Sequence, residues 1–195
     1  MGHLDGAVQG PLVWGHAALA ACAALYLAWW WIFFRPQEGR PAGARYGIGV
    51  ACIVAAAVLG VGGVASSIVG LGKLPVQGGA LPGWAFVAGA AVCYVALAYA
   101  TARLFHRPVT TELALFVAWA ALELAVASGL RAAGAWPDGL ALTMSVLVAA
   151  TMLACLACYV LYYRLPPLLS FVDGAVPLAL VGAMAVAMAA AMTGA

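Results

Sequence analysis

Long apolar runs separated by short polar segments make up the chain from one end to the other. Each run has about 20 or more residues, which at about 1.5 Å of rise per residue spans a hydrocarbon core of roughly 30 Å. The runs lack the alternation of polar and apolar residues that a membrane β-strand shows, and a helix satisfies its own backbone groups in lipid. We therefore predict an all-α membrane bundle of six transmembrane helices, over Pro11–Phe34, Tyr46–Gly70, Gly83–Phe105, Thr111–Leu130, Gly139–Tyr163 and Gly174–Thr193.

The segments between these runs carry most of the prolines and charged residues, and all of them are short. The fifth segment, Arg164–Asp173, ends in Ser-Phe-Val-Asp, which resembles a capping box that opens the sixth helix. None of the segments has room for a soluble domain, so residues 1–195 form a single transmembrane domain. No glycine-rich phosphate loop followed by lysine is present, which excludes a nucleotide-binding module in these residues.

The amino-acid composition also indicates that lipid surrounds the chain. The chain is 67% hydrophobic and 7% charged, whereas soluble domains average roughly 45–50% apolar and about 25% charged residues. The net charge of +2 comes without a dense basic run, so we expect no nucleic-acid partner. The five cysteines all lie inside apolar runs, which argues against a disulfide framework.

Lysine and arginine are distributed unequally between the two sets of loops. The first, third and fifth loops and the adjoining helix ends hold six arginines, whereas the opposite side holds Lys73 and Arg131. Cytoplasmic loops of membrane proteins are enriched in these residues. The sequence therefore predicts odd-numbered loops in the cytoplasm and both termini outside, in what we expect to be a bacterial cytoplasmic (inner) membrane.

Glu123 is the most informative single residue, because it lies near the middle of the fourth predicted helix. An ionised side chain at the bilayer centre costs roughly 2.5–3.5 kcal/mol on insertion scales. A glutamate at this depth should face the bundle interior, as a proton or cation relay or as a partner for a bound substrate. The alternative is a protonated carboxyl that hydrogen-bonds between helices as part of the packing.

Other polar side chains fall at related depths. Trp119 shares a helix face with Glu123, and Tyr94 and Thr151 lie near the same midplane. His16, Ser67 and Ser145 lie in the outer halves of their helices. We expect these residues to line a cavity open to the outside, with Glu123 at its floor. Alternatively, the small hydroxyl groups bond to carbonyls of their own helices.

The sequence offers little for metal or catalytic chemistry. His16 is one ligand without a partner at its depth, so neither haem nor zinc is expected, and we predict no cofactor. Cys155 and Cys158 form a Cys-x-x-Cys pattern inside a lipid-buried helix, where packing is the favoured role. No motif for a hydrolytic nucleophile or a metalloprotease is present, so we expect a protein that is not an enzyme.

The leading functional hypothesis is binding or transport of a small solute through an outward-facing cavity, with Glu123 as the protonatable or charge-pairing residue. Energy would come from an ion gradient or from a separate partner subunit. A second hypothesis is a non-transporting membrane subunit that anchors or scaffolds a larger complex. A third is a membrane enzyme acting on lipid or quinone, for which catalytic groups are lacking.

Overall fold

A computed structural model of the chain describes residues 6–36, 39, 41–75, 82–106 and 109–194. In these residues it contains six long helices and no strand, which confirms the predicted bundle. Each of the six is long and apolar enough to cross a membrane. The helices are α1 (Gly6–Phe34), α2 (Gly43–Gly72), α3 (Gly83–Leu104), α4 (Thr111–Ala132), α5 (Asp138–Leu161) and α6 (Pro167–Thr193), with a short 3₁₀ turn, η1 (Tyr162–Arg164), after α5.

Two helices begin five or more residues earlier than predicted. The helix α1 begins at Gly6 and contains Pro11, and α6 begins at Pro167 instead of Gly174. Proline at the first helical position is favourable, because its fixed φ suits a helix and its missing N–H needs no partner there. The predicted capping box is therefore wrong: Ser170 lies inside α6, and its hydroxyl donates to the carbonyls of Tyr162 and Leu165, at 2.7 and 2.9 Å.

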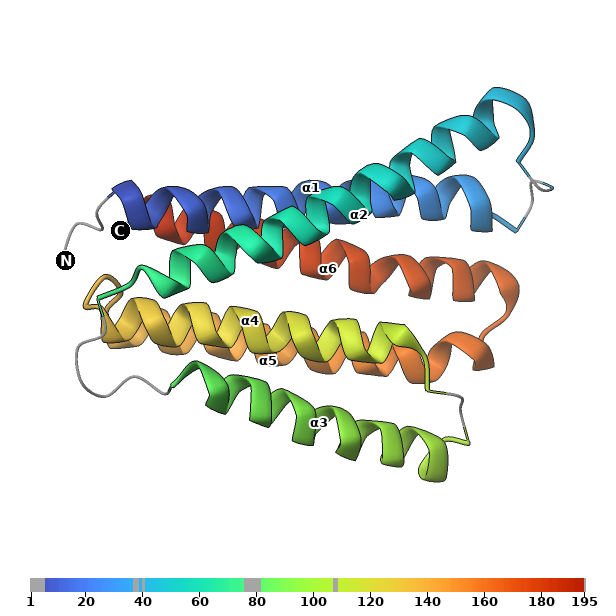
Figure 1. Ribbon diagram of the computed structural model, residues 1–195. Coiled ribbons are helices and arrows are strands. Elements are labelled where there is room, and N and C mark those ends of the chain that lie inside the picture. Colours follow the sequence, from blue (N-terminus) through green and yellow to red (C-terminus); the bar gives the residue numbers. More distant parts are fainter. Residues whose placement is uncertain (1–5, 37–38, 40, 76–81, 107–108, 195) are drawn as a thin grey trace.

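The helices run up and down, so that both ends of the chain lie at the same end of the bundle (Figure 1). The Gln9 side-chain amide donates to the carbonyl of Met192 at 2.7 Å, which ties the two ends together. We call this the terminal end, and it also holds Lys73 and Arg131. The opposite end, where α1, α3 and α5 finish, is the arginine end, and its described arginines are Arg35, Arg45, Arg103 and Arg164.

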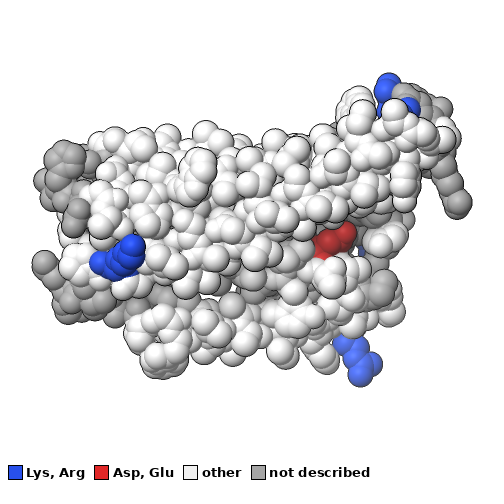
Figure 2. Space-filling view, turned by 45° about the horizontal axis from the view of Figure 1, so that its top comes forward, with Lys and Arg blue, Asp and Glu red and all other residues white. Residues whose placement is uncertain are grey.

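Charged side chains are confined to the regions near these two ends on the face seen in Figure 2, and the broad surface between them is uncharged. Many large hydrophobic side chains are exposed along the helices, including Val61, Val92 and Leu153 at 73%, 70% and 67%. A water-soluble protein rarely exposes continuous apolar surface of this extent. This is the surface distribution of a bundle surrounded by lipid.

The helix α1 packs along its whole length against α2, and on another side against α6. The buried face of α2 has a small residue at every seventh position, namely Gly49, Ala56, Gly63 and Gly70. A Cβ atom added at Gly63 would lie 2.8 Å from the carbonyl oxygen of Gly15 in α1. Small residues thus allow two backbones to come close together, as is common between membrane helices.

The other three helices form a looser group. The helix α4 packs between α3 and α5, and α5 in turn packs against α6. Thr101 is the sole buried residue among the described residues of α3. The main neighbour of α3 among the described helices is α4. The helix α3 therefore lies at the edge of the bundle and presents most of its surface to lipid (Figure 1).

Candidate functional site

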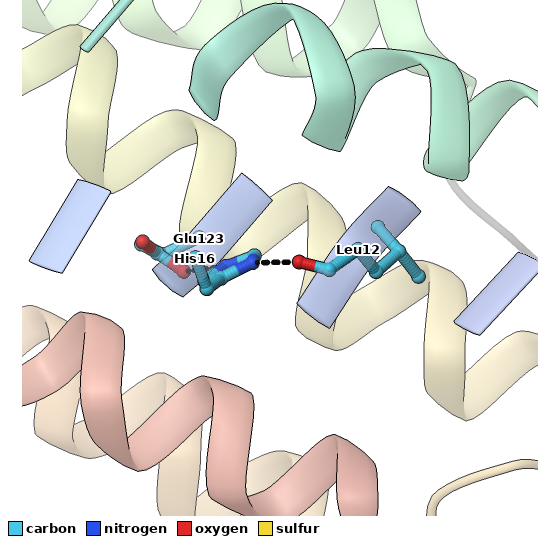
Figure 3. A network of polar contacts seen from close by, with 3 residues as sticks. All are labelled: Leu12, His16 and Glu123. Atoms are coloured by element: carbon cyan, nitrogen blue, oxygen red, sulfur yellow. Dashed lines mark hydrogen bonds and ion pairs between the residues drawn. The ribbon is translucent and has the colours of Figure 1, made fainter. Parts of the chain in front are cut away.

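A buried ionisable pair connects the two groups of helices. His16 on α1 and Glu123 on α4 have no exposed surface, and the His16 Nε2 atom lies 2.9 Å from the Glu123 Oε2 atom. The two residues are 107 positions apart in the sequence. Figure 3 shows the imidazole of His16 between the carboxyl group of Glu123 and the backbone of Leu12.

Each helix places its residue through a regular pattern. In α4 the buried residues recur every three or four positions, and Glu123 is the polar member of a stripe otherwise made of Leu113, Val117, Ala120, Val126, Ala127 and Leu130. In α1 the corresponding buried residues are Leu12, Gly15 and His16. Gly15 has no side chain and leaves room for Ser67 of α2. The buried stripe of each helix thus points its ionisable residue inward.

The hydrogen bonds define where the protons are. The His16 Nδ1 atom lies 2.8 Å from the carbonyl oxygen of Leu12. Because a carbonyl oxygen can only accept, Nδ1 carries a hydrogen and donates it. The contact between Nε2 and Oε2 then requires one further proton, held either by the imidazole or by the carboxyl group.

Both of these arrangements have a net charge of zero. An imidazolium with a carboxylate and a neutral imidazole with a carboxylic acid differ in the position of one proton along the same hydrogen bond. Loss of that proton would leave a carboxylate facing a bare ring nitrogen, with one uncompensated charge in a dry interior, which is costly. The geometry therefore makes His16 and Glu123 a site that holds one proton between two helices.

Three buried polar atoms, one on Glu123 itself, one elsewhere on α4 and one on α2, have no hydrogen-bond partner in the described part of the chain. They are the second carboxyl oxygen of Glu123, Oε1, the indole nitrogen of Trp119 one turn earlier on α4, and the hydroxyl oxygen of Ser67 on α2. In Figure 3 one oxygen of the Glu123 carboxyl group points away from His16. Unsatisfied buried polar groups are rare and often mark functional positions. Glu123 therefore has an acceptor, and Trp119 on the same helix has a donor, without a hydrogen-bond partner among the described residues.

The remaining predicted residues have different surroundings. Tyr94 and Trp119 are half-buried against the hydrophobic core, and Thr151 is half-buried on α5. The Ser145 hydroxyl donates to the carbonyl of Ala141, one turn earlier in its own helix, at 2.8 Å. This local hydrogen bond corresponds to the alternative interpretation of the small hydroxyl groups.

No route from solvent reaches the pair in this conformation. His16, Ser67 and Glu123 each have 0% exposed surface, which means that neither an open vestibule nor a water-sized void touches them. The expected outward-open cavity with Glu123 at its floor is therefore absent here. Next to the pair, α1 and α2 approach each other closely through Gly15, Gly63 and Gly70.

Within the described residues, no group of three or more histidine, cysteine, aspartate or glutamate side chains is arranged to hold a metal ion. All five cysteines are free thiols, including Cys155 and Cys158.

Comparison with known proteins identifies no relative: no family model matches the sequence, and neither a curated protein nor a solved structure matches it. The site must therefore be interpreted from its own geometry.

The sequence pattern indicated both His16 and Glu123 as candidate residues but not that they pair. The distance of each residue from the end of its helix would have indicated the pairing, because it gives the depth of the residue in the membrane. His16 is ten residues from the first residue of α1, Gly6, and Glu123 is nine residues from the last residue of α4, Ala132, and both of these helix termini lie at the terminal end. Beginning the first helix at Pro11 concealed this match.

Proposed function

We propose that this protein binds or transports a small solute across the membrane and that His16 and Glu123 together bind the proton that accompanies the solute. One observation supports this most directly: two titratable side chains from distant parts of the chain meet at 2.9 Å with no exposed surface. Ionisable residues inside a membrane are costly, and they commonly belong to ion or substrate pathways.

The bundle described above is then the closed state of the transporter. Transport requires a second state in which the site opens, here toward the terminal end, which we expect to lie outside the cytoplasmic membrane from the asymmetry of lysine and arginine. His16 belongs to the group formed by α1, α2 and α6, and Glu123 belongs to the group formed by α3, α4 and α5. A small movement of one group against the other would separate Nε2 from Oε2 and expose both to water.

The unused polar atoms indicate how a solute would be held. Glu123 Oε1 is an acceptor and Trp119 Nε1 is a donor, and both are buried without partners. A small solute that carries its own donor and acceptor would satisfy both atoms. Its binding would also compensate for the hydrogen bond lost when His16 moves away.

The second candidate, a non-transporting anchor or scaffold subunit, is favoured by a different observation. The pair is dry, and α3 exposes an apolar face along most of its length. In that function His16 and Glu123 would hold α1 and α4 together and would not exchange protons with water.

Proteoliposomes that contain a pH-sensitive dye distinguish these two functions. Amino acids, sugars, nucleosides and organic cations are added outside as separate solute classes, and the internal pH is followed for wild type, Glu123→Gln and Glu112→Gln. Glu112 is an exposed carboxyl at the beginning of the same helix and serves as the matched control.

We expect one solute class to change the internal pH with wild type and with Glu112→Gln but not with Glu123→Gln. Full solute-driven proton movement in Glu123→Gln would refute the role of the pair. Absence of any response by wild type to every class would favour the anchor or scaffold function instead.

A further inference from the structure

A hollow lies far from the buried pair, at the arginine end. It has a volume of about 320 Å³ and opens on the surface between α1, η1 and α6. Five of its nine lining residues are aromatic and two are prolines: Trp30, Phe34, Tyr162, Tyr163, Phe171, Pro36 and Pro167, together with Leu165 and Ser170. We call it the aromatic groove. Its volume is at the lower end of the range for small-molecule sites.

The walls of the groove are held in place by specific contacts. The Trp30 ring stacks on Phe34 with centroids 4.4 Å apart, and its indole N–H donates to the carbonyl of Phe171 at 3.0 Å. Gly174 has no side chain, and a Cβ atom there would lie 2.8 Å or less from the Trp30 ring. The hydroxyl of Ser170 ties the beginning of α6 to η1. The groove is therefore built by ordered side chains from three elements.

Two arginines flank the groove. Arg164 directly follows the lining residue Tyr163, is exposed, and has no ion-pair partner among the described residues. Arg35 directly follows the lining residue Phe34, and its guanidinium lies 5.1 Å from the centroid of the Trp31 ring. The described acidic residues nearest to this end do not line the groove: Glu112 is on α4, and Asp173 has a buried carboxyl oxygen. Among the described residues, Arg164 thus places a positive charge next to the groove.

Further apolar side chains are exposed at the level of the groove. Leu168, Leu169 and Val172, on the other face of α6, are 53%, 53% and 51% exposed, and Trp31 on α1 is 53% exposed. In a membrane, an arginine at this end lies at the headgroup level and aromatic rings lie at the interface. The positive charge and the aromatic lining match the phosphate and the adjoining apolar part of an anionic phospholipid.

From this complementarity we infer that the aromatic groove binds one anionic phospholipid, with its phosphate beside Arg164 and the adjoining part of its acyl chains against the aromatic lining. The lipid-binding groove is separate from the buried pair of His16 and Glu123, and lipid binding does not depend on the proposed solute transport.

Native mass spectrometry of the delipidated full chain in detergent tests this inference. Phosphatidylglycerol and phosphatidylcholine with identical acyl chains are titrated separately onto wild type, Arg164→Gln and Arg103→Gln. Arg103 is an exposed arginine at the same end, on the distant helix α3, and its substitution removes the same charge without touching the groove.

We expect wild type and Arg103→Gln to prefer phosphatidylglycerol, and Arg164→Gln to bind it about fivefold more weakly, since an arginine near a membrane surface contributes about that factor. Equal binding of phosphatidylglycerol by the two variants, or equal binding of the two lipids by wild type, would overturn the inference. Displacement of phosphatidylglycerol by inorganic phosphate at equal concentration would identify a free-phosphate site instead and would also overturn it.

A steric variant tests the groove itself. Leu165→Trp places a larger side chain in the hollow. We expect this variant to bind the first molecule of either lipid more weakly. Unchanged elution on size exclusion checks that the variant is folded. Unchanged lipid binding in a correctly folded Leu165→Trp protein would show that the lipid does not occupy the groove.

Discussion

The interface between α1 and α2 and the exposed helix α3 contrast strongly in how they are stabilised. Along the first, glycines bring two backbones within contact distance, and a Cβ at Gly63 would lie 2.8 Å from the Gly15 carbonyl. Along α3, by contrast, residues such as Val87, Val92 and Tyr99 are 70%, 70% and 67% exposed. Similar apolar composition therefore serves close helix packing in one place and contact with lipid in the other.

The physical reason lies in the solvent. Lipid tails are about as apolar as leucine, so burying an apolar side chain between membrane helices gains little from the hydrophobic effect. What distinguishes an interface is van der Waals packing at close range and hydrogen bonds between helices. The region around Gly15, Gly63 and the pair of His16 and Glu123 has both, whereas α3 has neither to a comparable extent.

The largest effect should come from breaking the buried pair. Glu123→Ala leaves the His16 Nε2 atom without its partner, and loss of one member of a buried pair typically costs about 3–5 kcal/mol. Because the imidazole can remain neutral, we expect a loss near the lower limit of that range. Denaturant titration in mixed micelles measures the free energy of unfolding.

The control for this prediction is Glu112→Ala on the same helix. Its exposed carboxyl interacts with the Thr110 hydroxyl and the helix terminus, so its loss should cost less than about 1 kcal/mol. Replacing both His16 and Glu123 with leucine should restore much of the lost stability. The single variants His16→Leu and Glu123→Leu complete the comparison. If the double variant loses as much unfolding free energy as the two single variants together, the pair is not energetically coupled.

An intermediate effect is expected when a leucine is shortened at a packed position. Leu130 in α4 has no exposed surface, whereas Leu104 at the end of α3 is 70% exposed. Leu130→Ala leaves a cavity and should cost about 2–3 kcal/mol, toward the lower end because lipid is also apolar. Leu104→Ala should change stability by less than about 0.5 kcal/mol. Equal losses in the same unfolding titration would mean that α3 is packed as tightly as α4.

The smallest of these losses should come from adding one methyl group to the glycine interface. Gly63→Ala forces α1 and α2 apart at the Gly15 carbonyl and should cost about 1 kcal/mol, the lower end of the range for overpacking. Gly62→Ala is the matched control, because no atom lies within 4 Å of a Cβ added there. Thermal unfolding in detergent, followed by circular dichroism, compares the two variants. If Gly62→Ala destabilises as much as Gly63→Ala, the loss reflects something other than the closeness of α1 and α2.

The sequence by itself determined the class of the fold and the number of helices. Apolar runs of about 20 residues can satisfy their backbone groups in lipid only as helices, so length and composition were enough. The inward orientation of Glu123 also followed, because an ionisable group facing acyl chains is too costly. Helix ends were less certain: Gly6–Gly10 and Pro167–Asp173 are helical although polar residues or prolines made them look like loops.

Only the tertiary structure decided which polar residues meet. His16 and Glu123 pair because α1 and α4 bring equal depths together, whereas Ser145 bonds to its own helix at Ala141. Hydrophobic periodicity gives the buried face of a helix but not the neighbour that this face contacts. In a bundle where nearly every residue is apolar, the neighbour of each buried face is decided by how all the helices pack together, as at the close approach of α1 and α2 through Gly15 and Gly63.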